Sequence, residues 1–204
     1  PDILARALDG GADLWLTVSG DGPDLPHVRT TCERLGINSR VNFLGTVPRC
    51  AVPDLMSSHD AFLFPSIFEG LPITLLEAMA AGCVPVASRI HGVTDFIVTD
   101  GHSGLLFRVG DTSQAAVQLG SLCADETRQL ALSSAARSAV SSFTLDRQAD
   151  SYYRVLHSLM SCARPVRPPL PIARWRLPRQ LRPSWWSSLP TPLKTVLRIA
   201  RERF

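Results

Sequence analysis

Two glutamates on either side of a Gly-Leu-Pro turn are the residues of this chain best placed to do chemistry. Glu69 and Glu77 stand eight positions apart in FPSIFEGLPITLLEAMAAG, which runs from Phe64 to Gly82. The stretch predicts the end of a buried strand, a short loop and a helix that is apolar almost all round. A carboxylate on a buried helix needs a partner, which favours a ligand role for Glu77 over a solvated one. Glu69, taken alone, fits a loop acid equally well.

The turn before this helix has the features of an anion site. Pro72 fits the first helical position, where its missing N–H costs nothing. The free amides of Leu71, Ile73 and Thr74 would then point outward at the positive end of the helix dipole, which suits a phosphate or diphosphate. Gly70 would let a ligand approach the backbone closely.

The two carboxylates are suited to hydroxyl groups rather than to phosphate, because like charges repel. A nucleotide-sugar has hydroxyls on both sides of its diphosphate, on the ribose and on the hexose. Glu69 lies just before the helix and Glu77 more than a turn inside it, so each could reach one of these groups. Dinucleotide-binding folds use an acid on the ribose in the same way. The pattern therefore predicts a nucleotide-sugar site.

Short apolar runs alternate with helical segments along the first half of the chain. The expected strands cover residues 13–20, 40–45, 61–66, 84–88 and 104–107, and the expected helices cover residues 2–8, 26–36, 50–59 and 93–98. This alternation indicates a parallel sheet covered on both faces, with ligands at the carboxyl ends of the strands. We predict a doubly wound α/β domain over residues 1–112, with helices over 111–143 and 145–161 packed around it.

Charge is divided unevenly along the 204 residues. Residues 164–204 contain ten Lys or Arg and one acid, whereas residues 1–163 contain eleven bases and seventeen acids. No apolar run approaches the length of a membrane span. The chain begins with PDILARAL, without Met or a signal-peptide pattern, which suggests a chain cut from a longer one.

The cysteines are scattered and form no C-x-x-C pair, which disfavours a zinc site and indicates reduced thiols in a cytoplasm. They are Cys32, Cys50, Cys83, Cys123 and Cys162. We interpret each as a small buried hydrophobe.

The segment PSIFEGLPITLLEAMAAGCVPVAS, residues 65–88, resembles the E-x7-E signature of retaining glycosyltransferases of family 4, which have the GT-B fold. Four further blocks stand in the family's order: VSGDGP, RVNFLG, HDAFLFPS and DGHSGLLFRVGD. The resemblance covers residues 1–160. It implies that they form the Rossmann-like, C-terminal half of a GT-B fold, which binds the donor.

The resemblance also implies roles for individual residues. In the family the first glutamate faces the donor sugar and the second contacts the ribose, which makes Glu69 the catalytic residue here and Glu77 a donor ligand. The other implied donor-binding residues are Gly20 and Gly22 in a turn near the nucleotide, Phe43 and Val47 beside the base, and Gly70, Leu71, Pro72, Ile73 and Thr74 around the distal phosphate. The Gly20–Gly22 pattern alone is equally typical of a tight turn. Family members need no metal and no cofactor, and no D-x-D-like pair stands near this site.

This chain departs from the family pattern in three places. The family begins this domain with a strand and then a loop with an Arg and a Lys-Gly pair that clamp the diphosphate. That segment and the N-terminal acceptor domain are not found here. In place of a Gly-Gly pair followed by Glu, the chain has His91, Gly92 and then Asp95. Asp95 is either that acid or a helix-start acid, and His91 is either a ligand or a solvated side chain.

These observations give two hypotheses of function. The first is the donor-binding half of a retaining hexosyltransferase that moves a sugar from a nucleotide-sugar to a glycan or lipid-linked acceptor in cell-surface polysaccharide synthesis. Without the acceptor domain, the chain alone should be inactive, because the two substrates cannot be brought together. The alternative is a non-catalytic nucleotide-sugar-binding module, either a remnant or a subunit paired in trans. An epimerase of the same fold is disfavoured by the paired glutamates.

The end of the chain lies outside the resemblance. Residues 161–192 form a Pro/Arg/Trp-rich linker, and residues 193–204 predict a short basic amphipathic helix. This composition suits an anionic membrane surface, which places the protein in the cytoplasm, peripheral at the inner face of a membrane. A disordered, solvated tail is an equal alternative. A third interpretation of this segment is nucleic-acid binding. Its charge alone does not exclude this, but no nucleic-acid motif supports it.

Overall fold

The computed structural model describes residues 1–161 and 189–202. The chain divides into two compact units: Pro1–Ser141 with Ile199–Phe204, and Ser142–Arg198. The predicted linker over 161–192 lies almost wholly outside the described residues. No helix in the described part of the chain is long and apolar enough to cross a bilayer.

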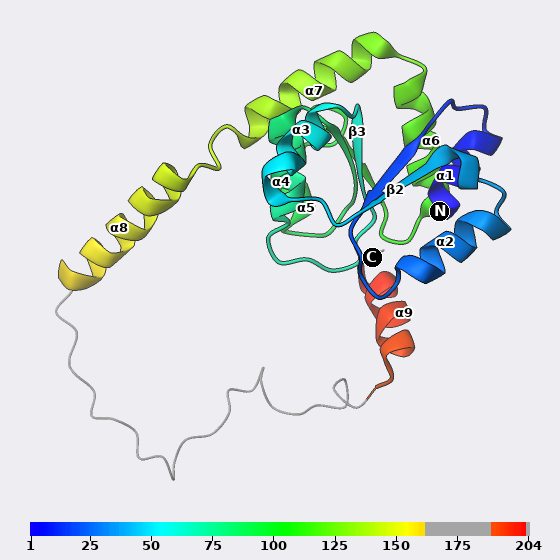
Figure 1. Cartoon of the computed structure of the whole chain (residues 1–204). Helices are drawn as coiled ribbons and strands as arrows, with labels where there is room; N and C mark the ends of the chain where they lie inside the picture. The colour runs from blue at the N-terminus through cyan, green and yellow to red at the C-terminus, as the bar shows by residue number, and fades with distance from the viewer. Residues whose placement is uncertain (162–188, 203–204) are drawn as a thin grey trace. The chain divides into compact units, whose positions relative to one another are not determined.

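Five strands and nine α-helices occur among the described residues (Figure 1). The strands are β1 (Leu16–Ser19), β2 (Val41–Gly45), β3 (Ala61–Phe64), β4 (Val84–Ser88) and β5 (Leu105–Phe107). The helices are α1 (Asp2–Asp9), α2 (Leu25–Arg34), α3 (Val52–Ser57), α4 (Ile73–Ala81), α5 (Thr94–Ile97), α6 (Thr112–Cys123), α7 (Glu126–Val140), α8 (Leu145–Ser161) and α9 (Thr191–Glu202). Two 3₁₀ turns, Asn38–Arg40 and Arg49–Ala51, precede β2 and α3.

Every strand pair is parallel, as predicted, but the strands form two sheets rather than one. β1 pairs with β2, and β3, β4 and β5 pair in that order. A side-chain contact joins the two sheets, since His59 Nε2 lies 2.8 Å from the hydroxyl oxygen of Thr17. β4 has a strand on each side and is buried throughout, whereas β1 and β3 are half-buried. The Rossmann-like α/β class is therefore confirmed, with a division between β1 and β3 that the sequence did not predict.

Helices cover both faces of the three-stranded sheet. Alternate residues of β4 point to opposite faces. Val84 and Val86 pack with α1 and α6 in one cluster, and Ala87 packs with α4 and α7 in another. A third cluster, built around Leu4 of α1 and Cys32 of α2, covers the two-stranded sheet. The predicted two-face covering is thus present around β4.

Two expectations about the second half need correction. The predicted helix over 111–143 is two helices, because Asp125 interrupts it and caps α7 by accepting from the Arg128 amide at 2.9 Å. Cys32 and Cys83 are buried as expected, but Cys50 and Cys123 are exposed. A helix forms at 145–161 as predicted, and α9 covers Thr191–Glu202 where the sequence predicted a helix over 193–204. The packing of α8 around the domain stays a prediction.

Candidate functional site

The loop between β3 and α4 contains Glu69 and most of the residues that the sequence predicts to bind the donor. α4 begins at Ile73, and Pro72 is its N-cap with a non-helical ψ of 86°. The predicted position of Pro72 inside the first turn is therefore wrong by one residue. No side chain of the described residues caps this helix. The amides of Leu75 and Leu76 both point to the Pro72 carbonyl, at 3.1 and 3.3 Å, so the helix end leaves earlier amides available to an anion.

The surroundings of this helix end are open. A Cβ built on Gly70 would meet no atom within 4 Å. Leu71, Ile73 and Thr74 are exposed, whereas Pro72 is buried and anchors the turn. A ligand can therefore approach the backbone of residues 70–74 without displacing a side chain.

Glu69 is half-buried and held by its own loop. The Ser66 hydroxyl donates to Glu69 Oε1 at 2.7 Å and lies 3.3 Å from the Phe68 carbonyl. Sequence reasoning did not single out Ser66. The S-x-x-E spacing of Ser66 and Glu69 could have indicated this contact, because a Glu three residues after a Ser often reaches back toward it.

Glu77 is exposed, which corrects the expectation of a helix buried almost all round. Leu75, Ala78 and Met79 are buried, but Ile73 and Ala80 are exposed with Glu77. Glu77 follows Ile73 by four residues and Thr74 by three, so the three lie on one face of α4. The open amides of the first turn lie at the start of the same helix, one turn before Glu77. Glu77 thus needs no buried partner and is accessible to a ligand at the helix start.

The loops after β1 and β2 lie against each other. The Gly20 amide donates to the Gly45 carbonyl at 2.7 Å, and Gly20 has a φ of 129° that other residues rarely adopt. Gly22 follows in the same turn, where an added Cβ would meet nothing within 4 Å. The hydrogen bond brings this predicted turn next to the end of β2, just before the half-buried Val47.

Phe43 of β2 is half-buried, and the Arg29 guanidinium carbon lies 4.1 Å from its ring centroid. One face of the aromatic ring is therefore covered by a cation. Arg29 had no signal in the sequence, because the contact joins α2 to a strand across a turn. Phe43, the residue proposed to lie beside the base, therefore has the cationic side chain of Arg29 as a neighbour.

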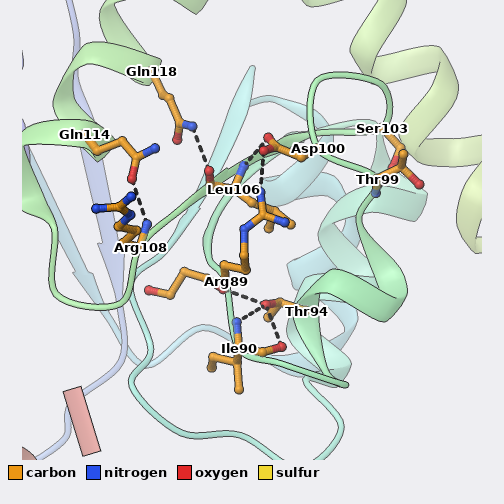
Figure 2. A network of polar contacts seen from close by, with 11 residues as sticks. Arg89, Ile90, Thr94, Thr99, Asp100, Ser103, Leu106, Arg108, Gln114 and Gln118 are labelled. Carbon is orange, nitrogen blue, oxygen red and sulfur yellow. Dashed lines mark hydrogen bonds and ion pairs between the residues drawn. The ribbon is translucent and has the colours of Figure 1, made fainter. Parts of the chain in front are cut away.

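The loop after β4 is fixed by an internal network (Figure 2). The buried Thr94 hydroxyl donates to the Ser88 carbonyl at 2.6 Å and accepts from the Ile90 amide at 2.7 Å. Arg89 pairs with Asp100, whose other oxygen accepts from the Leu106 amide at 2.9 Å. These bonds hold the start of the loop against β5.

The two polar residues further along this loop contact each other. Asp95 accepts from the Gly92 amide at 2.7 Å and lies 3.3 Å from His91 Nδ1. Both carboxylate oxygens of Asp95 therefore have partners in the loop itself. This arrangement favours the helix-start acid over a ligand role for Asp95.

No group of three or more His, Cys, Asp or Glu side chains in the described residues is arranged to hold a metal ion. The polar groups at the start of α4 and on its flanks are instead helix-start amides and the carboxylates of Glu69 and Glu77, a set that suits phosphate and hydroxyl groups.

This chain is similar in sequence and in fold to known proteins. Residues 2–139 match the family model described as glycosyl transferases group 1. The sulfoquinovosyl transferase SQD2 of Arabidopsis thaliana is 32% identical over 132 residues, which cover 63% of this chain and 25% of the relative. The N-acetyl-alpha-D-glucosaminyl L-malate synthase of Bacillus anthracis is 34% identical over 128 residues, or 63% of this chain and 33% of the relative.

A solved structure shares the fold. Anabaena Alr3699/HepE, in complex with UDP-glucose, superposes with a TM-score of 0.65 at 24% identity, covering 78% of this chain and 44% of that chain. The present chain spans 25% and 33% of the length of the two curated relatives.

Proposed function

Because this chain belongs to the glycosyl transferases group 1 family, we propose that it is the donor-binding half of a retaining hexosyltransferase. The observation that carries the proposal is the open start of α4, with Glu69 held beside it and Glu77 accessible on the same helix. Helix-start amides match a diphosphate, and the carboxylates match hydroxyls on its two sides. A relative of this fold was solved with UDP-glucose, which supports a nucleotide-sugar as the donor.

In the proposed reaction the chain's own groups bind and orient the donor. The amides of Ile73 and Thr74 would meet the charge that develops on the leaving diphosphate, an electrostatic form of catalysis that needs no metal. Glu69 would hold the hexose through its hydroxyls, and Glu77 the ribose. Gly20, Gly22, Phe43 and Val47 would line the nucleotide. We assign no cofactor to this reaction.

The acceptor is the less constrained part of the proposal. We propose a glycan or lipid-linked acceptor, in cell-surface polysaccharide synthesis at the cytoplasmic face of a membrane. A separate N-terminal domain would bind this acceptor, so the present chain alone is expected to be inactive in transfer.

We also propose that the complete domain has one more strand, between β1 and β3, followed by the basic loop of the family. The division of the sheet at this point supports it, because β1 and β3 are half-buried where a neighbouring strand would cover them. α1 leads directly into β1, as the crossover helix of a β-α-β unit does.

The alternative is a non-catalytic nucleotide-sugar-binding module, either a remnant or a subunit paired in trans. Asp95 stands where the family often has a glutamate, and both of its carboxylate oxygens have partners within its own loop. Its lack of a free oxygen for a ligand favours this alternative. Upstream coding sequence distinguishes the two. A second Rossmann domain and the Arg/Lys loop support the enzyme, and a start codon just before Pro1 supports the module.

The test is calorimetric titration of the folded chain with UDP, GDP and ADP, beside the variants Glu77→Gln and Glu126→Gln. Glu126 is an exposed acid on α7 and serves as the matched control. We expect saturable binding of one nucleotide, weakened about fivefold by Glu77→Gln, because the charged carboxylate acceptor becomes a neutral amide and its hydrogen bonds to the ribose hydroxyls become weaker. Glu126→Gln should bind as the parent does. Absence of binding to all three nucleotides by a folded chain would contradict donor recognition by this chain alone.

A further inference from the structure

α9 presents an exposed apolar face. Leu193, Val196 and Leu197 are 46%, 61% and 36% exposed. Their spacing of i, i+3 and i+4 places the three on one side of the helix. Apolar side chains gathered on one exposed face gain free energy when a partner removes them from water.

The sequence around α9 is strongly basic. Residues 189–204 contain four Lys or Arg and one acid. The wider segment of residues 164–204 has ten bases and one acid and also contains Trp175, Trp185 and Trp186. Residues 1–163, by contrast, hold seventeen acids and eleven bases. An extended anionic partner would therefore be attracted more strongly to this end of the chain than to residues 1–163, whose net charge is negative.

The combination of charge and apolar face selects among anionic partners. A nucleic acid would satisfy the positive charge but leave Leu193, Val196 and Leu197 in water. An anionic bilayer meets both features, because its headgroups attract Lys and Arg and its acyl boundary accepts apolar side chains. We propose that α9 binds the surface of an anionic bilayer, lying in the interface with its apolar face toward the acyl chains. This inference deepens the proposed membrane location and does not depend on the donor site.

The experiment is co-sedimentation of the full chain with two kinds of vesicle, one of phosphatidylcholine alone and one of phosphatidylcholine with phosphatidylglycerol. We expect binding to the mixed vesicles, reduced by salt, and little binding to the neutral ones. Absence of binding to the anionic vesicles, or equal binding to both kinds, would overturn the proposal.

Two variants at Val196 separate insertion of the apolar face from simple charge attraction. Val196→Asp should weaken binding about tenfold or more, since it removes an apolar group that the bilayer would bury and adds a repulsive charge. The control Thr195→Asp adds the same charge at the neighbouring position, outside the face of Leu193, Val196 and Leu197, and should weaken binding less.

Val196→Lys adds positive charge but removes the apolar group. If α9 inserts, this variant binds the mixed vesicles more weakly than the parent does. If charge alone drives binding, as it would for a nucleic acid, Val196→Lys binds as tightly or more tightly, and the proposal is wrong. Circular dichroism and nucleotide titration of the same samples show whether each variant is folded. They also separate failure of this inference from failure of the donor-site proposal.

Discussion

Glu69 and Glu77 differ in how firmly the structure holds them. Ser66 donates to Glu69 at 2.7 Å, so this carboxylate has a fixed orientation before any ligand binds. Glu77 is exposed on α4 and would lose side-chain freedom on binding. A fixed carboxylate suits the reacting sugar, where small errors of geometry cost rate. A mobile one suits recognition of the ribose, which is remote from the bond that breaks.

Cys83 makes stability depend on pH in alkaline solution. Burial raises the pKa of its thiol, the nearby carboxylate of Asp60 raises it further, and the Arg137 guanidinium opposes the rise. The thiol donates to the Met56 carbonyl at 2.9 Å, which also needs the protonated form. As pH rises, the unfolded chain ionises at Cys83 before the folded chain does. We expect the contribution of Cys83 to the free energy of unfolding to be fully present below about pH 8 and to decrease as the pH rises above this value.

Urea denaturation at about pH 7.5 and about pH 9.5 measures this effect. In Cys83→Ala the thiol is absent, so the loss of stability between the two pH values should be smaller than in the parent chain. Contributions from other titrating groups cancel in this comparison. An equal loss in both proteins would show that Cys83 ionises alike in the folded and unfolded states.

At the scale of elements, local patterns predicted position better than exposure. Periodicity and capping residues close in sequence predicted the strand runs and the start of α4 to within one residue. They also predicted the helix at 145–161 and, shifted by two residues, the helix at 191–202. The exposed face of α4 could not be predicted, because α3 and α7 decide which of its apolar residues are covered. Ile73 stays in water although it is at least as apolar as Met79, which is buried.

The same limit applies to the candidate site. The paired glutamates and the glycine turns are local patterns and were found. The position of Arg29 over Phe43 is a contact between the two separate elements α2 and β2, which no spacing encodes. The division of the sheet also depends on pairing between distant strands, so the strand runs alone predicted one continuous sheet.

Gly82, the C-cap of α4, occupies a position where a side chain would destabilise the end of the helix. Its φ is 98°, and an added Cβ would lie 2.3 Å from a terminal guanidinium nitrogen of Arg137. That nitrogen donates to the Ala81 carbonyl at 3.2 Å, and the Ser133 hydroxyl donates to the Gly82 carbonyl at 2.6 Å. We expect Gly82→Ala to lower the free energy of unfolding by about 2–3 kcal/mol, from left-handed strain and displacement of Arg137. Thermal or chemical denaturation measures it.

Gly101→Ala is the matched control, because Gly101 also has a positive φ of 74° but an added Cβ would meet nothing within 4 Å. It should cost about 1–2 kcal/mol, the strain alone. If the two variants lose equal stability, the contact between Arg137 and the end of α4 adds nothing. A smaller loss from Gly82→Ala when Arg137→Ala is also present would support the contact.

At the scale of the α/β unit, the divided sheet implies unequal local stability. β4 is hydrogen-bonded to a strand on each side and is fully buried, and its side chains belong to the clusters on both faces. β1 pairs with β2 alone among the described residues and is half-buried. Fewer apolar contacts and an open edge lower the free energy needed for local opening. The β1–β2 sheet should therefore open without disrupting the β3–β4–β5 sheet.

Hydrogen exchange followed by mass spectrometry tests this order directly. Peptides from β4 should exchange most slowly, at rates near those of global unfolding, and peptides from β1 and β2 should exchange at least about tenfold faster. The two loops joined by the Gly20–Gly45 hydrogen bond belong to the faster sheet, so a nucleotide that binds there should slow the exchange of β1 and β2 more than that of β4. Equal protection of both sheets in the free chain would mean that they unfold as one unit, with the contact between His59 and Thr17 sufficient to couple them.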